Sequence, residues 1–319
     1  MNILFKNVAR PILAILFIVT GPDPLAYADA ATLHYASNTK THQLEAAADG
    51  FTLLDVAGSI SDPAGVNVRV NALPAGTKAL VWVGNLDNAP KGSACPIPSF
   101  TAKQFQAQVD ALAGNPRVYG YYLSDEPHPS VCPNAATDIR ARADYIHSHT
   151  TQKSFIVVLD GYNLCAGNMG CEYEALAPAK THVDLIGIDP YPCHYDKNGV
   201  AVPCDVTQIT AKANTAIAKG IGINVIVPVF QTFGQEGKTG GKGIYYRTPT
   251  SAEMQAMLSA WHTIAPNPVM DYSYTYGVQC SASACPSPQT ISNHPEIKAI
   301  IRSHNTEKVT IAPAASSGL

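Results

Sequence analysis

Short apolar segments alternate with helical segments along most of the chain, and this alternation constrains the fold more than any other feature. Each apolar segment is shorter than an ordinary helix, and most are apolar without a regular polar interruption. Such runs are typical of parallel strands that are buried on both faces. We expect eight of them, at residues 32–36, 51–56, 77–83, 118–126, 154–159, 184–192, 224–230 and 268–273.

The segments between these strands have helical patterns. We expect helices at residues 41–49, 99–113, 135–149, 206–219, 251–262 and 294–304, with a short crossover at residues 63–74. Eight β/α repeats in a chain of this length predict the α/β class and a single (β/α)8 barrel of the TIM type. An open doubly wound sheet is the weaker alternative, because Ala57-Gly58-Ser59 does not supply the glycine-rich turn that such a fold requires.

The N-terminus has the pattern of a secretory signal. Lys6 and Arg10 precede an apolar run at residues 11–20, and small residues at 26–28 or 28–30 offer a cleavage point. The run is too short to span a bilayer. We therefore expect a signal peptide at residues 1–30, a barrel domain at 31–305 and a disordered tail at 306–319. The mature protein is expected to be secreted or periplasmic, with no membrane association after cleavage.

Charge and composition exclude some partners. The chain of 319 residues has a net charge of −3, only 14% charged residues and no run of Lys and Arg. These features argue against a nucleic-acid partner. We expect a monomer without a cofactor.

Eight cysteines are consistent with export, because an even number in an oxidising compartment favours disulfides. Their clustering predicts pairs between neighbours: Cys95–Cys132, Cys165–Cys171, Cys193–Cys204 and Cys280–Cys285. In a barrel these pairs would brace the loops that follow the strands. Zinc is the rival interpretation for Cys165/Cys171 and Cys280/Cys285, but their spacing is not the usual Cys-x2-Cys. No metal site is therefore expected.

Polar residues stand at the ends of most of the expected strands. In a barrel, such residues lie at the face where ligands bind. They are Asp55, Asn85, Asp125, Glu126, Asp160, Asp189, Gln231 and Asp271. The alternative is structural: Asp125 could cap the next helix, and Glu126 could pair with a nearby base.

The strand at residues 118–126 must end at its two acids, because Pro127 cannot continue a ladder of hydrogen bonds. Side chains on a strand alternate between its faces, so only one of Asp125 and Glu126 should point into the barrel. An inward Glu126 places Tyr122 and the small Ser124 inside with it. By the same rule, an inward Asp189 accompanies Gly187 and Leu185.

Aromatic residues crowd the same loops and strand ends. Flat apolar faces with hydroxyl tips suit sugar rings, although any single ring is better explained as packing. The set comprises Trp82, Tyr121, Tyr162, Tyr191, Tyr195, Phe230, Phe233, Tyr245, Tyr246, Tyr274 and Tyr276. Beside carboxylates, it favours a saccharide site.

Three short motifs resemble those of a known clan. They are Tyr-Leu-Ser-Asp-Glu-Pro at 122–127, Ile-Asp-Pro-Tyr-Pro at 188–192 and Val-Phe-Gln-Thr-Phe-Gly at 229–234. This pattern is similar to that of the (β/α)8 glycoside hydrolases that place an acid/base Glu after strand four, the clan A type. The resemblance implies that Glu126 is the acid/base. The clan has a nucleophilic Glu at the end of strand seven, where this chain has Gln231.

An amide cannot form the glycosyl ester of a retaining mechanism, so three interpretations remain. Asp189 supplies the second carboxylate, Glu236 reaches in from the glycine-rich loop at 234–243, or the barrel binds sugar without cleaving it. We expect a glycoside hydrolase that acts on a poly- or oligosaccharide through Glu126 and Asp189, with a non-catalytic saccharide-binding barrel as the alternative. The expected substrate contacts are Asp55, Trp82, Asn85, Tyr122, Asp125, Asp160, Tyr191, Gln231, Glu236, Tyr272 and Tyr274.

Overall fold

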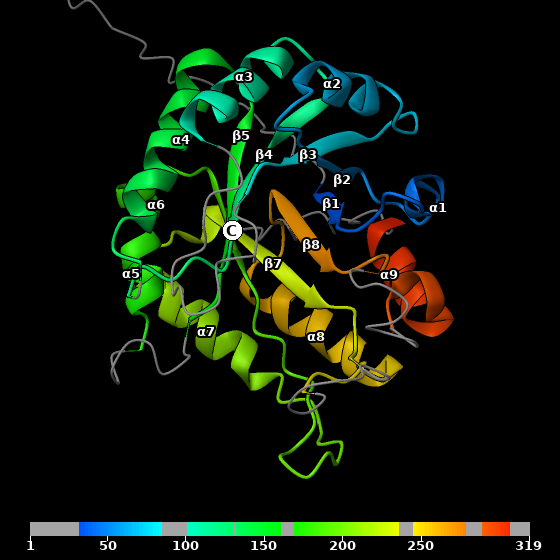
Figure 1. The fold of residues 1–319 in the computed structure, drawn as a ribbon. Helices are drawn as coiled ribbons and strands as arrows, with labels where there is room; N and C mark the ends of the chain where they lie inside the picture. Colours follow the sequence, from blue (N-terminus) through cyan, green and yellow to red (C-terminus); the bar gives the residue numbers. More distant parts are fainter. Residues whose placement is uncertain are drawn as a thin grey trace, which may run out of the picture. The chain divides into compact units, whose positions relative to one another are not determined.

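In a computed structural model of the chain, the structure describes residues 32–84, 101–130, 132–160, 169–235, 245–278 and 289–306. Eight strands close into one barrel in sequence order, every neighbouring pair is parallel, and the last strand pairs with the first (Figure 1). The strands are β1 (Leu33–Ala36), β2 (Leu53–Ala57), β3 (Lys78–Trp82), β4 (Val118–Asp125), β5 (Lys153–Val158), β6 (Leu185–Ile188), β7 (Ile226–Gln231) and β8 (Met270–Tyr274). The predicted (β/α)8 barrel is confirmed.

At least one helix follows each strand. The helices are α1 (Gln43–Ala48), α2 (Pro63–Asn71), α3 (Ala102–Leu112), α4 (Ala135–His149), α5 (Cys171–Leu176), α6 (Pro178–Thr181), α7 (Thr207–Ala218), α8 (Ser251–Ile264) and α9 (Pro295–Thr306), with short 3-10 turns at Ile223–Val225 and Ile291–Asn293. The sequence did not predict α5 and α6, because both are short and Pro178 separates them. Thr101 and Thr250 begin α3 and α8 with capping boxes, in which the Thr hydroxyl accepts from a backbone N–H one turn later.

The core has two layers, one inside the barrel and one between the strands and the helices. Tyr122 belongs to the inner layer, whereas Tyr121 and Leu123 pack outward against the helices. The inner layer comprises Tyr35, Leu53, Leu80, Tyr122, Phe155, Val157, Leu185, Val227, Val229, Met270 and Tyr272. Because parallel strands share one direction, the residues that follow them meet at a single mouth of the barrel.

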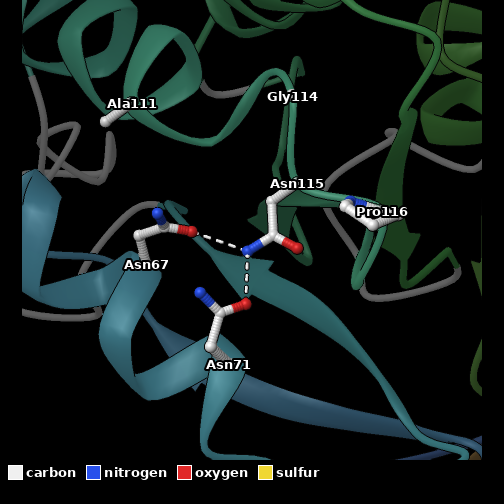
Figure 2. Close-up of a pocket in the computed structure, with 6 residues that line it drawn as sticks. All are labelled: Asn67, Asn71, Ala111, Gly114, Asn115 and Pro116. Atoms are coloured by element: carbon white, nitrogen blue, oxygen red, sulfur yellow. Dashed lines mark hydrogen bonds between the residues drawn. The ribbon is translucent and has the colours of Figure 1, made fainter.

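Near the start of β4, at the opposite end of the strands, an asparagine cluster joins β4 to α2 (Figure 2). The side-chain N–H groups of Asn115 donate to the amide oxygens of Asn67 at 2.6 Å and Asn71 at 2.9 Å. These residues border an open pocket of about 350 Å³. Arg117 lies next to them and donates to the backbone oxygens of Leu73 and Pro74. This part of the molecule fixes the end of α2 and has no catalytic constellation among the described residues.

No helix in the described parts of the chain combines the length and the hydropathy that a membrane crossing requires.

Candidate active site

The backbone changes direction where β4 ends. Glu126 has a positive φ of 45°, a conformation that few residues other than glycine adopt, while its N–H still donates to the backbone oxygen of Val157 at 3.0 Å. The pairing of β4 with β5 also shifts register between Tyr122 and Ser124. Strict alternation of side chains is therefore lost just before the two acids.

Both acids reach the mouth of the barrel as a result. The Tyr122 hydroxyl, in the inner layer of the core, donates to Asp125 Oδ1 at 2.6 Å. The carboxyl group of Glu126 is a close neighbour of Asp189 and acts on its pKa. The expectation that only one of Asp125 and Glu126 faces the interior is wrong, because alternation requires an unbroken extended strand and Glu126 is not extended.

Asp189 follows β6 and is 1% exposed. No N–H or hydroxyl group among the described residues donates to its carboxylate oxygens, and its hydrogen-bonding partner is the carboxyl group of Glu126. Burial raises the pKa of Asp189 well above its usual value, the nearby charge of Glu126 raises it further, and Lys212 on α7 opposes the shift. A buried carboxyl group beside a second carboxyl group favours holding a proton, and this is the arrangement of an acid/base pair.

The interior just below these acids is made of tyrosines. Tyr122 and Tyr272 lie in the inner layer with ring centroids 6.3 Å apart, and Trp82 packs edge-on against Tyr122 at 4.5 Å. Burial raises the pKa of Tyr122 well above its usual value, and the charge of Asp125 adds to the effect. These phenols therefore remain neutral and able to donate hydrogen bonds.

Tyr191 and Tyr274 form the adjoining side of the mouth, with ring centroids 5.8 Å apart, and Phe233 packs against both, at 5.2 and 5.1 Å. Burial, followed by the charge of Asp189, raises the pKa of Tyr191 well above its usual value. Ring contacts and charge interactions thus connect most of the predicted site residues into one group. Its members are Trp82, Tyr122, Asp125, Glu126, Asp189, Tyr191, Tyr272 and Tyr274.

Other predicted site residues have structural partners. Asp55 accepts from the N–H of Thr39 at 2.7 Å and from its hydroxyl at 2.5 Å, although burial raises its pKa. Asp160 is 2% exposed and accepts from the backbone N–H of Gly170 at 2.9 Å at the start of α5. Asn85 and Glu236 lie outside the described residues.

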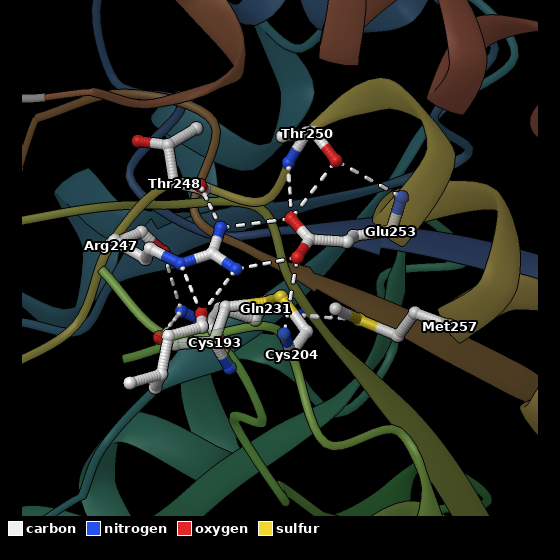
Figure 3. Close-up of a disulfide and its surroundings, with 9 residues drawn as sticks. Cys193, Cys204, Gln231, Arg247, Thr248, Thr250, Glu253 and Met257 are labelled. Carbon is white, nitrogen blue, oxygen red and sulfur yellow. Dashed lines mark hydrogen bonds and ion pairs between the residues drawn. A yellow bond between two sulfur atoms is a disulfide. The ribbon is translucent and has the colours of Figure 1, made fainter. Parts of the chain in front are cut away.

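Gln231, at the end of β7, is bonded entirely to the backbone (Figure 3). The side chain of Gln231 is 0% exposed. Its amide oxygen accepts a hydrogen bond from the backbone N–H of Cys193 at 2.8 Å. Its amide nitrogen donates to the backbone oxygens of Cys193 at 2.8 Å and of Arg247 at 3.0 Å. This pattern needs one acceptor and one donor group, so a glutamate would not satisfy it. The amide of Gln231 therefore has a structural role in joining these loops.

The loops after β6 and β7 are joined around Gln231. Cys193 and Cys204 form a disulfide, as predicted. Arg247 binds Glu253 with two hydrogen bonds, of 2.8 and 2.5 Å, and donates to the backbone oxygen of Val202 (Figure 3). The hydrogen bond from Arg247 lowers the pKa of Glu253 to about 2, against the opposing effect of burial.

The remaining disulfide predictions lie partly outside the described residues. Cys132 and Cys171 are each disulfide-bonded, which removes the zinc alternative for Cys171. Cys95, Cys165, Cys280 and Cys285 lie outside the part of the chain that the structure describes.

Two residues of this region were not singled out from the sequence. Tyr35 lies in the inner layer, with its ring centroid 4.6 Å from that of Tyr272. It was missed because its strand is short and its sequence pattern only weakly indicates which side chains point inward. Lys212 is a lysine on an amphipathic helix, which is usually solvated; here it donates to the backbone oxygen of Asp160 at 2.9 Å. The expectation that Asp271 lies at the ligand-binding end of its strand is wrong. β8 continues to Tyr274, so Asp271 is near the start of the strand, and it points outward toward His34 and His304.

No known family model and no curated protein sequence matches the chain. Several solved structures do resemble it in fold. A chitinase from Chromobacterium violaceum aligns with a TM-score of 0.52 at 12% identity, over 87% of this chain and 100% of its own. The C-terminal domain of a putative chitinase from Desulfitobacterium hafniense aligns at 0.53 and 11% identity, over 86% and 99%.

A family 18 chitinase from Flavobacterium johnsoniae aligns at 0.50 and 10% identity, over 77% of this chain and 88% of its own. The (β/α)8 barrel fold of this chain is shared with these chitinases. At these identities the likeness concerns the fold, and residue roles have to be argued from the site itself.

Proposed function

We propose that the protein is an exported glycoside hydrolase that cleaves a poly- or oligosaccharide, with Glu126 and Asp189 as its two working carboxyl groups. The observation that carries the proposal is Asp189, a buried carboxyl group whose hydrogen-bonding partner is a second carboxyl group, that of Glu126, at the carboxyl ends of the strands. A buried pair of acids does not stabilise a fold, and such pairs concentrate at functional sites.

In this mechanism Glu126 is the group that meets the substrate, because it is partly exposed while Asp189 is buried. Glu126 and Asp189 share one proton over the working pH range, since two adjacent carboxylates do not both ionise readily. When that proton is on Glu126, it passes to the glycosidic oxygen as the bond between this oxygen and the anomeric carbon breaks. A water molecule then adds to the anomeric carbon and returns a proton to the pair. The tyrosine rings offer the faces and neutral hydroxyl groups on which a sugar can rest.

The fold neighbours make chitin oligosaccharides the first substrates to test. Residues 1–30 would direct export, and the mature chain would act as a monomer. These statements are part of the proposal.

The decisive experiment compares wild type with Glu126→Gln on a panel of polysaccharides. The variant is expected to lose hydrolysis by a factor of about 10²–10⁴, because an amide has no proton acidic enough for the leaving oxygen. Its affinity for the same oligosaccharide should remain within a few-fold of wild type. Glu296→Gln is the matched control, because Glu296 is exposed at the start of α9 and should behave as wild type.

The alternative is a barrel that binds a saccharide without cleaving it. One observation favours it: Gln231 occupies the position of the clan's nucleophile and is fully used by the backbone. If the wild-type protein binds an oligosaccharide from the panel and releases no product from any of them, this alternative is correct.

A further inference from the structure

A cluster of two histidines and an aspartate lies on the outer side of the barrel, away from the mouth. Asp271 sits between Met270 and Tyr272 on β8; these two neighbours belong to the inner layer, so Asp271 points outward. It is 2% exposed. His34 of β1 and His304 of α9 converge on its carboxyl group.

The three side chains offer their ligand atoms to one small volume. His34 Nδ1 is 3.0 Å from each carboxylate oxygen of Asp271, and His304 Nε2 is 2.9 Å from one of them. One nitrogen from each imidazole and a carboxylate oxygen all lie within 4.8 Å of one another. Ligands at the usual zinc distances around a tetrahedral ion are about 3.4 Å apart. The distances from the two nitrogens to the carboxylate of Asp271 would therefore have to lengthen by a few tenths of an ångström to admit an ion.

The surroundings hold this geometry in place. The backbone of His34 is fixed between strands, because its N–H donates to Thr52 Oγ1 at 2.9 Å and its oxygen accepts from the N–H of Thr52 at 3.0 Å. The two imidazole rings pack edge-on with centroids 5.3 Å apart, and the buried Phe230 packs against His304 at 5.4 Å. His304 is 31% exposed, which leaves a path from solvent.

We propose that His34, Asp271 and His304 form a binding site for a divalent transition-metal ion, of which Zn²⁺ is the probe of choice. Two imidazoles and one carboxylate suit zinc and its neighbours, whereas calcium and magnesium prefer oxygen ligands alone. Water fills the remaining coordination positions. The ion joins the first strand, the last strand and the last helix, so its role is to stabilise the closure of the barrel and not to take part in the reaction at the mouth.

The test is Zn²⁺ binding to the purified full chain after dialysis against a chelator, measured by calorimetry and by metal analysis. Wild type is expected to bind one ion per chain and to gain about 5 °C or more in thermal midpoint at saturating Zn²⁺. His34→Asn and His304→Gln keep an amide N–H in place of the imidazole N–H and so retain the hydrogen bond to Asp271. Each should weaken binding at least 10-fold and remove the thermal gain.

His147→Gln is the matched control, because His147 contacts Asp184 at 2.8 Å but no second histidine among the described residues shares that carboxylate with it in a metal-binding arrangement. It should bind Zn²⁺ as wild type does. The proposal is overturned if wild type binds no Zn²⁺, or if both the His34 and His304 variants bind it as tightly as wild type does. Cobalt(II) gives an independent check, since its visible spectrum reports nitrogen ligands and should change in the same two variants.

Discussion

Asp189 and Glu126 place two destabilising features side by side at the mouth of the barrel. The carboxyl group of Asp189 is removed from water, and its partner is another carboxyl group, that of Glu126. The left-handed backbone of Glu126 adds strain of about 1–3 kcal/mol. Residues held in this way at the end of a barrel strand are consistent with a site that is maintained for chemistry at the expense of stability.

Asp189→Asn should lower turnover while it raises stability. Folding raises the pKa of the Asp189 carboxyl group, so this group lowers the free energy of unfolding at every pH above its ordinary pKa of about 4. The loss of stability grows with pH until the pH exceeds the pKa of the group in the folded protein. The thermal midpoints of variant and wild type should therefore coincide near pH 3 and diverge towards about pH 7, with the variant higher. Calorimetry across this range, together with turnover on the substrate, measures both effects.

Asp184→Asn should change stability in the opposite direction to Asp189→Asn. Burial opposes its ionisation, but hydrogen bonds from His147, Ser154 and Lys153 hold the pKa of Asp184 below its usual value. The stability it provides is present above about pH 4 and is lost as the pH falls. The Asp184→Asn variant should be less stable than wild type at neutral pH, with unchanged turnover.

For Asp189→Asn, a gain in thermal stability that does not depend on pH would contradict the role given to the carboxyl group of Asp189.

At the scale of elements, Gln231 shows how the end of β7 is joined to two loops. Its amide connects the loop after β6, at Cys193, to the segment before α8, at Arg247. The Cys193–Cys204 disulfide and the Arg247–Glu253 ion pair reinforce the same junction. The position of Tyr191, two residues before Cys193, depends on this junction.

Gln231→Glu should destabilise the protein and should not create a nucleophile. A carboxylate would face the backbone oxygens of Cys193 and Arg247 without a hydrogen to donate, at a loss of about 1–3 kcal/mol or more. We expect a lower midpoint in urea unfolding and no gain in hydrolysis.

Gln235→Glu is the matched control for this substitution. The amide oxygen of Gln235 accepts from the N–H groups of Tyr245 and Tyr246, and a carboxylate oxygen can accept both bonds equally well. This variant should unfold at the wild-type midpoint. An increase in activity in Gln231→Glu would show that the strand-seven position is catalytic after all.

At the scale of the whole barrel, the first and last elements depend on each other. β1 pairs with β8 over four residue pairs, and α9 buries Ile297 and Ile301 completely. Asn305, near the end of α9, donates to the backbone oxygen of Asp49 after α1 at 3.1 Å. The stability of the N-terminal strand therefore depends on the last helix.

A chain that ends at residue 306 keeps all of α9 and should be as stable as the full chain. A chain that ends at residue 294 should lose its cooperative unfolding transition. It lacks two buried isoleucines, each worth about 1.5–3 kcal/mol, in a domain whose total stability is of the order of 5–15 kcal/mol. Circular dichroism during heating distinguishes the two; equal midpoints would show that α9 is dispensable.

Much of the barrel could be predicted from the sequence, because buried parallel strands leave continuous apolar runs and their polar ends are easy to locate. The proximity of Glu126 and Asp189 followed from the same rule. The position of Asp125 could not be predicted, since it depends on a register shift and on one left-handed residue. The partners of Gln231 were also hidden, because they are backbone groups of distant loops.

The parallel pairing of β1 with β8 also determines when the molecule can fold. His34 and Asp271 are 237 residues apart in the chain, so the barrel cannot close until nearly all of the polypeptide has been made. Contacts of such long range form slowly. For a chain that we propose is exported, this delay is useful: the emerging polypeptide remains extended long enough to be threaded through a translocation channel and folds on the far side.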